Sequence, residues 1–339
     1  MKKKKLFIFL GLAVVLAVGA FFYIRYKTAN PKEPHVNFDA LYQAMDAEET
    51  VCTVNGREIS WDEYYNEYSN NIHQFEYNFV QMQTYYGIKL TWDDATSVEG
   101  YNYATLAQKY TEDTLIHQGA LMKYASDKGA SYDPAKQNPT TELFNQIYGS
   151  HGEKLPADDA RTWMDNQGYL HLMQILLFIE DPETGEKLSD EQLSEKALLA
   201  EETIAEIKAI ESNEERVSRF SELVAQINED PGMAEMTEGY TVLKSNVYTQ
   251  ICDAVAKIED YGVTEVISTE RGYNIIMRLP NNPDEIPFEY QAQEDQKSTG
   301  RLLCAYDLFN KEADEYIKNT EIEYLEGIII PDVREYLVR

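Results

Sequence analysis

The chain has 339 residues, enough for two or three domains of ordinary size, and its share of 43% hydrophobic and 12% aromatic residues indicates packed cores rather than disorder. It carries 59 acidic against 30 basic residues, which gives a net charge of -29. A body this acidic repels phosphate backbones, so we expect no nucleic-acid partner.

The N-terminus predicts a membrane anchor. Four lysines precede the uncharged residues 6–24, and Arg25 and Lys27 follow them. As a helix this run spans roughly 28 Å, enough for the hydrocarbon core of a bilayer. Because the basic end should stay in the cytoplasm, we predict a single-pass cell-membrane protein with a basic stub and signal anchor at 1–27 and the bulk of the chain outside. A cleaved signal peptide is the alternative, with V-G-A at 18–20 as its cleavage site, although the apolar run continues beyond it.

Two short strands open the extracytoplasmic part. After a proline-containing linker at 28–48, V-C-T-V-N-G-R-E-I-S places a turn at Asn55-Gly56 between two strand-like segments. Ser60, with Glu63 three residues later, is the sequence signature of a capped helix start. The pattern is then mostly helical up to residue 168, with helices predicted at 100–128, 139–147 and 156–166.

The stretch from 64 to 110 is unusually rich in aromatic residues. It holds more large rings than one small helical core needs. Most should be buried, and some could line a cleft for unfolded chains, because tyrosine offers a large amphipathic contact. The residues concerned are Tyr64, Tyr65, Tyr68, Phe75, Tyr77, Phe79, Tyr85, Tyr86 and Trp92.

The pattern changes at Tyr169. The apolar run Y-L-H-L-M-Q-I-L-L-F-I predicts a buried strand, and the turn residues E-D-P-E-T-G end it. We predict helices at about 189–210 and 214–227, followed by a loop at 229–233. A third helix at about 246–258 and a closing pair of strands at 263–268 and 272–279 complete the segment. This order predicts a compact α+β domain.

The last part of the chain is again helical. A proline-rich link at 280–287 leads into an amphipathic helix predicted over 290–318. The segment T-E-I-E-Y-L-E after it alternates as a strand does.

Most catalytic signatures are missing from the sequence. The five histidines have no close metal-ligand spacing, and there is no phosphate-binding glycine loop, dinucleotide fingerprint or nucleophile elbow. The three cysteines are far apart and form no redox or metal pair. We therefore expect neither a metal nor a cofactor.

Four segments between 169 and 280 resemble, in order, the parvulin-type (PpiC) peptidyl-prolyl isomerases. M-Q-I-L-L stands where that family has its first strand, S-H-I-L-V. F-S-E-L-V-A-Q-I-N-E-D-P-G-M follows F-x-x-L-A-x-x-x-S-x-D-P-G-S without a gap, and N-V-Y-T-Q-I-C-D-A-V-A-K-I and V-T-E-V-I-S-T-E-R-G-Y-N-I-I match the two segments after it. Four matches in register are more specific than any one of them.

The flanks are similar to the extracytoplasmic foldases of the bacterial SurA and PrsA type. V-N-G-R-E-I-S-W-D-E-Y after an export signal looks like the start of those proteins, in which both chain ends build a helical chaperone domain around an inserted parvulin domain. The resemblance therefore implies an α+β protein with a chaperone domain from 49–168 and 281–339 and a parvulin-like domain at 169–280. It also implies that T-E-I-E-Y-L-E pairs near V-C-T-V-N-G.

The site that the resemblance implies departs from the family pattern. Where the family has two histidines in the floor, this chain has Gln174 and Asn274, and the acid at the rim is kept as Asp230. Amide side chains donate and accept hydrogen bonds but do not titrate. They could preserve weak catalysis, or they could merely hold two strands together. His171, three residues before Gln174, should point to the opposite face of its strand.

The proline pocket is less aromatic than the family's. Its Met and two Phe positions fall on Val247, Ile251 and Ala256, and the glycine-rich turn G-G-D-L-G becomes T-E-G-Y-T at 237–241. A slimmer pocket would hold proline differently. The resemblance therefore leaves open whether the domain is an active enzyme.

These observations together predict a membrane-anchored extracytoplasmic foldase or chaperone whose peptidyl-prolyl isomerase activity is weak or absent. Its partners would be unfolded or nascent exported polypeptides, their proline-containing segments, and the membrane through residues 6–24. A fully active isomerase is the main alternative. A non-catalytic structural ectodomain of a membrane complex is a further one.

Overall fold

The computed structural model describes residues 35–233, 236, 238–291 and 297–338. The predicted anchor at 6–24 lies outside these residues. Among the residues described, no helix combines the length and the apolar character needed to cross a membrane. The described chain mixes helices and sheets, as the predicted α+β class requires.

The chain divides into two compact units, each described here by itself. Unit 1 takes the residues up to Leu143 and those from Lys311 on, so both ends of the chain contribute to it. Unit 2 is Phe144–Asn310. The parvulin-like segment 169–280 lies within unit 2 together with the helices next to it. The domain limits proposed from the sequence remain predictions.

Unit 1 holds a three-stranded antiparallel sheet in the order β3-β2-β8. The predicted turn joins β2 (Thr50–Val54) to β3 (Arg57–Ser60), with φ of 50° at Asn55 and 74° at Gly56, both in the left-handed region that a two-residue hairpin favours. β8 (Ile322–Tyr324) pairs with β2. The pairing implied between the end of the chain and V-C-T-V-N-G is therefore confirmed.

Two long helices pack on this sheet and on each other, α3 (Trp61–Tyr86) and α4 (Tyr103–Asp127). α4 approaches β2 closely at Gly119, because a Cβ there would lie 2.4 Å from a methyl group of Val54. Large rings dominate the core of unit 1. Its fully buried side chains include Trp61, Tyr64, Tyr68 and Tyr124.

The two ends of the described chain pair with each other. β1 (His35–Val36) runs antiparallel to β9 (Leu337–Val338), next to α2 (Phe38–Tyr42) and a 3-10 turn at Val333–Tyr336. Glu76 in α3 accepts a hydrogen bond of 2.6 Å from the backbone of β1. This bond ties the pair to the helix. The sequence analysis did not anticipate this small sheet.

Two of four further helices cross from one unit to the other along the chain. α5 (Pro139–Tyr148) and α11 (Gly300–Lys318) each begin in one unit and end in the other, whereas α6 (Ala157–Gln167) and α10 (Phe288–Gln291) belong to unit 2. The helix predicted from residue 290 thus begins only at Gly300. The Thr299 hydroxyl caps it there.

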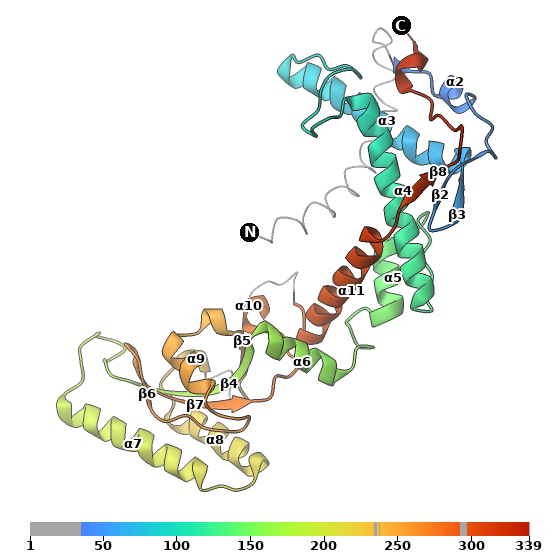
Figure 1. Ribbon diagram of the computed structural model, residues 1–339. Helices are drawn as coiled ribbons and strands as arrows, with labels where there is room; N and C mark the ends of the chain where they lie inside the picture. Colours follow the sequence, from blue (N-terminus) through green and yellow to red (C-terminus); the bar gives the residue numbers. More distant parts are fainter. Residues whose placement is uncertain (1–34, 234–235, 237, 292–296, 339) are drawn as a thin grey trace. The chain divides into compact units, whose positions relative to one another are not determined.

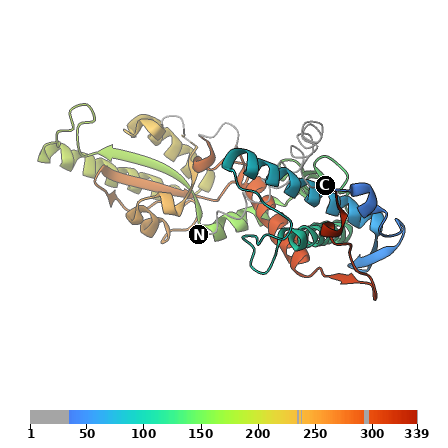
Figure 2. The same cartoon turned by 90° about the horizontal axis from the view of Figure 1, so that it is seen from above.

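Unit 2 is built on a four-stranded antiparallel sheet in the order β5-β4-β7-β6 (Figure 1). The long central strands, β4 (Tyr169–Phe178) and β7 (Gly272–Leu279), lie side by side in Figure 2. β6 is only Ile267–Ser268, shorter than the strand predicted at 263–268. β5 (Tyr240–Leu243) was not predicted.

Helices cover both faces of this sheet. α7 (Asp190–Lys208) and α8 (Asn213–Ile227) bury one face, and α9 (Thr249–Val255), shorter than predicted, covers the other. Short 3-10 turns lie at Pro231–Met233 and Lys244–Asn246. Residues alternate along β4, so the α7–α8 face takes Met173, Ile175 and Leu177 and the α9 face takes Leu172.

Candidate functional site

The candidate site lies on the α9 face of the unit 2 sheet, across its central strands. In the register of β4 and β7, Leu176 lies opposite Asn274 and Gln174 lies opposite Ile276. Gln174 and Asn274 are thus diagonal neighbours on one face, within reach of long side chains. Gln174 Nε2 donates to Asn274 Oδ1 at 3.0 Å. The two residues that the resemblance sets at the family's histidine positions are therefore in direct contact.

Asn274 is only 2% exposed, so its amide must find hydrogen-bond partners within the protein, and it does. Its Nδ2 lies 3.0 Å from Thr269 Oγ1, 3.1 Å from the Gly272 carbonyl and 3.3 Å from the Ile267 carbonyl, so two N–H groups have three acceptors. Its oxygen accepts the bond from Gln174. A buried amide paired in this way carries no desolvation penalty for unmade bonds. This explains how a poor strand former is accommodated in β7.

Tyr240, at the start of β5, reaches the same pair of amides. Its hydroxyl donates to Gln174 Oε1 at 3.1 Å. Burial raises the pKa of Tyr240 to about 12, and the negative charge of Asp230 adds to this effect. The phenol is therefore protonated at neutral pH and remains a donor. Gln174 is held from both sides by neutral groups.

Asp230 lies on the loop after α8, and β4 fixes this loop in place. The N–H of Leu176 donates to Asn228 Oδ1 at 2.9 Å, and Asn228 Nδ2 donates to the backbone carbonyl of Asp230 at 2.8 Å. The Asp230 carboxylate accepts the Gly232 N–H at 3.0 Å and lies 3.6 Å from the Arg271 guanidinium. Its side chain is 18% exposed. The rim acid is thus reachable, but it already has a donor and a cation beside it.

The proline-pocket residues predicted from the resemblance differ in their burial. Ile251 is 4% exposed and belongs to the apolar cluster on the α9 face, and Val247 packs against that cluster. Ala256, at the end of α9, is exposed, and the buried position next to it is Val255. Their part in binding a peptide stays a prediction.

The structure thus brings Gln174 and Asn274 together and sets Ile251 on the same face. It places Asp230 close enough to act on the pKa of Tyr240. Sequence reasoning missed Tyr240, which lies in T-E-G-Y-T, the segment that the resemblance aligns with the family's glycine-rich turn. The alternation of Y-T-V-L that starts there is the strand signal that could have found it.

His171 takes no part in the floor, as its odd offset from Gln174 predicts. Its Nδ1 donates to the Pro280 carbonyl at 3.0 Å, and its Nε2 lies 3.5 Å from a carboxylate oxygen of Glu285. Within the described ranges, no group of three or more His, Cys, Asp or Glu side chains is arranged to hold a metal ion. The described groups of the candidate site are the amides of Gln174 and Asn274, the phenol of Tyr240 and the carboxylate of Asp230.

A hollow of about 830 Å³ lies on the other face of unit 2. It is lined by Met173, by Val217 and Ser218 of α8, and by Tyr261 among others. Because Met173 belongs to the α7–α8 face of β4, this hollow does not open on the floor amides.

Solved structures similar to this chain are those of the family that its sequence resembles. The peptidyl-prolyl isomerase domain of TbPar42 is 20% identical, and the match covers 32% of this chain and 98% of that one, with a TM-score of 0.26. The peptidylprolyl isomerase PrsA from Bacillus anthracis is 13% identical over 77% of this chain and 89% of that one, with a TM-score of 0.25. A SurA-like chaperone structure from Campylobacter jejuni is 17% identical over 82% of this chain and 100% of that one, with a TM-score of 0.26. No family profile and no curated protein matches the chain. All three TM-scores are below 0.5, so the fold described above stands on this chain's own strand order and contacts.

Proposed function

We propose that this chain is a membrane-anchored extracytoplasmic foldase that holds unfolded or nascent exported polypeptides, and that its parvulin-like domain has weak or no isomerase activity. The anchor is inferred from the basic and apolar residues 1–27, and the foldase role from the resemblance of the chain beyond them. The difference from a working isomerase lies in the hydrogen bonding of the two floor residues, Gln174 and Asn274.

The floor amides are closed on each other and on the protein around them. Prolyl isomerisation means twisting an amide, whose barrier is about 18–20 kcal/mol for peptide bonds. An enzyme lowers such a barrier with fixed dipoles aimed at the twisting group. Here both ends of the Gln174 amide are engaged, by Asn274 and by Tyr240, and both ends of Asn274 are engaged as well. These dipoles are therefore directed at the protein and not at a bound peptide.

One observation favours the alternative of an active isomerase. Asp230 keeps the family's rim position, and its carboxylate is still 18% exposed. It could face the twisting carbonyl of a peptide whose proline rests against Ile251. On that alternative, Asp230 is the residue whose loss abolishes catalysis.

Refolding and aggregation assays on the same preparation test both possibilities. A client whose refolding is limited by proline isomerisation should refold at nearly the same rate with and without the chain, because the proposed isomerase activity is weak or absent. If the chain accelerates this step strongly and Asp230→Ala removes the acceleration, the isomerase alternative holds. The chain should suppress aggregation of an unfolded client, and Asp230→Ala should leave this suppression unchanged. A chain that suppresses no aggregation is not the proposed foldase.

A further inference from the structure

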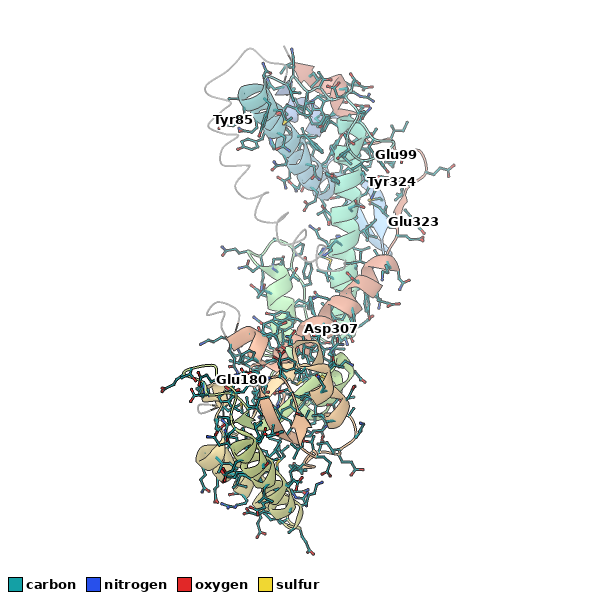
Figure 3. The ribbon with its side chains drawn as sticks, turned by 90° about the vertical axis from the view of Figure 1, so that its left-hand side faces the viewer. Tyr85, Glu99, Glu180, Asp307, Glu323 and Tyr324 are labelled. Carbon is teal, nitrogen blue, oxygen red and sulfur yellow. The ribbon has the colours of Figure 1, made fainter. Side chains whose placement is uncertain are left out.

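The last third of α3 is only partly covered by the described part of unit 1. All the buried residues of this helix lie before residue 77. Tyr85 and Tyr86 are 72% and 71% exposed, and Ile88, just after the helix, is 46% exposed. Figure 3 labels Tyr85 at this end of α3. Along these last 15 Å or so of helix, at roughly 1.5 Å per residue, only the ring of Phe79 packs on the core. Residues 77–88 are called the open end of α3 below.

The open end of α3 has no charged residue, although 26% of the whole chain is charged. Its apolar side chains include Val80 and Met82, which are half-buried, and Tyr85 and Tyr86, which are exposed. A helix surface that only faces water normally carries charged residues. Uncharged apolar surface kept in water is typical of an interaction site.

The open end is also held in a fixed conformation. The helix finishes in a closed cap, in which the N–H groups of Gly87 and Ile88 donate to carbonyls of the last turn at 3.0 and 3.2 Å. On one side the ring of Phe79 packs against Trp92, with centroids 5.2 Å apart. The surface is therefore already formed before a partner arrives, which lowers the entropy cost of binding.

The chain directly after the open end is acidic. Residues 89–102 include three acidic residues and a single basic one, Lys89. The negative end of the α3 dipole lies at the open end, and the last turn of the helix has no basic residue to offset it. In the loop that follows, Asp93 is paired with Arg334, but Asp94 and Glu99 are exposed.

These features select a cationic and partly apolar polypeptide. Tyrosine faces attract ammonium and guanidinium groups. The negative field repels an anionic bilayer, and it repels a second copy of a chain that carries -29. Building on the proposed function, we propose that the open end of α3 holds segments of unfolded exported polypeptides in which Lys or Arg occurs beside apolar side chains.

Peptide binding to the full chain, reconstituted in nanodiscs of neutral lipid, tests this site. The probe is a fluorescent unstructured peptide that contains Lys and Phe, and a second peptide has every Lys replaced by Glu. Tyr85→Ser with Tyr86→Ser should weaken binding of the lysine peptide by on the order of tenfold. The glutamate peptide should bind the unchanged chain more weakly by on the order of tenfold. The matched control, Leu198→Ser with Ile329→Ser, removes two apolar side chains that are 57% and 84% exposed elsewhere, and it should change the affinity less than about twofold.

Equal affinities of the unchanged chain and the double tyrosine variant would overturn this site. If the variant still suppresses client aggregation fully, the foldase role stands and the site is wrong. If the unchanged chain suppresses no aggregation, the proposed function itself fails. Two further results would also overturn the proposal. One is self-association that the tyrosine substitutions abolish, and the other is binding to phosphatidylglycerol vesicles that they abolish.

Discussion

Replacing Asn274 by alanine should loosen the central strands of unit 2. The side chain is 2% exposed, accepts one bond from Gln174 and has three acceptors within 3.3 Å of its Nδ2. Alanine removes the bond to Gln174 and the donor for the Thr269 hydroxyl and the turn carbonyls. At about 1 kcal/mol net for each bond, plus a cost of similar size for groups left unpaired, the free energy of unfolding should fall by about 2–4 kcal/mol.

Hydrogen exchange of the β7 amides, followed by mass spectrometry, measures this change for unit 2 by itself. Asn274→Asp should destabilise more than alanine at pH 7, because a carboxylate would face the acceptor oxygens. It should regain stability as the pH falls, since the protonated carboxyl can donate. Asn246→Ala, which removes an exposed amide bonded to Glu289, is the matched control and should cost less than about 1 kcal/mol. Unchanged protection of β7 in both Asn274 variants would refute the view that this amide holds the strands together.

Three other changes test the packing and the site. Gly119→Ala should lower the free energy of unfolding in urea by roughly 1–3 kcal/mol, because the clash of the new Cβ with Val54 outweighs the gain in helix propensity. Val54→Ala in the same chain should restore part of the lost stability. The pKa of Tyr240 is raised to about 12. Its phenol should therefore support the fold fully below pH 10, where it is protonated in both the folded and the unfolded chain. This support should decrease as the pH rises toward 12, because the phenol of the unfolded chain ionises first. Tyr240→Phe should remove up to about 2 kcal/mol of that alkaline decline in urea titrations at pH 9 to 12, and an unchanged decline would contradict the burial of this phenol. Gln174→His with Asn274→His should raise the rate of proline-limited refolding above that of the unchanged chain. A folded double variant with no such activity would show that the apolar pocket, too, no longer accepts proline.

Elements that depend on neighbouring residues could be predicted from the sequence. The turn at Asn55-Gly56 needs left-handed backbone at two adjacent positions, and Ser189 with Gln192 forms both bonds of a capping box at the start of α7. Each of these signals lies within four residues of the feature it sets. β1 and β9 could not be found in this way, because each has two residues and pairs with a partner at the other end of the chain. The start of α11 was misplaced because an amphipathic pattern does not mark where a helix begins, whereas the cap at Thr299 does.

The site shows the same division between near and distant information. The resemblance placed Gln174 and Asn274 in one floor, but no spacing in the sequence says that their amides bond to each other. That bond follows from the register of β4 against β7, and the reach of Tyr240 follows from the register of β5 against β4. Register is fixed by the packing of a whole sheet face. A tyrosine whose partner lies 66 residues away therefore could not be assigned from its own surroundings.

The pairing of the chain ends in unit 1 sets an order of folding during synthesis. β2 can pair with β3 early but lacks its second neighbour until β8, at Ile322–Tyr324, has been made, and β1 waits longer for β9. Unit 2 is a continuous segment that ends at Asn310, so all of its residues arrive first. The chain between β2 and β8 is a long loop that must close when these strands pair. The entropy cost of closing a loop grows only slowly with its length, so the late pairing of the last strands of unit 1 carries no large penalty. A chain arrested before Ile322 should therefore carry a finished unit 2 and an unfinished unit 1. On the proposed function, the protein would become able to hold clients only after its own synthesis is nearly complete.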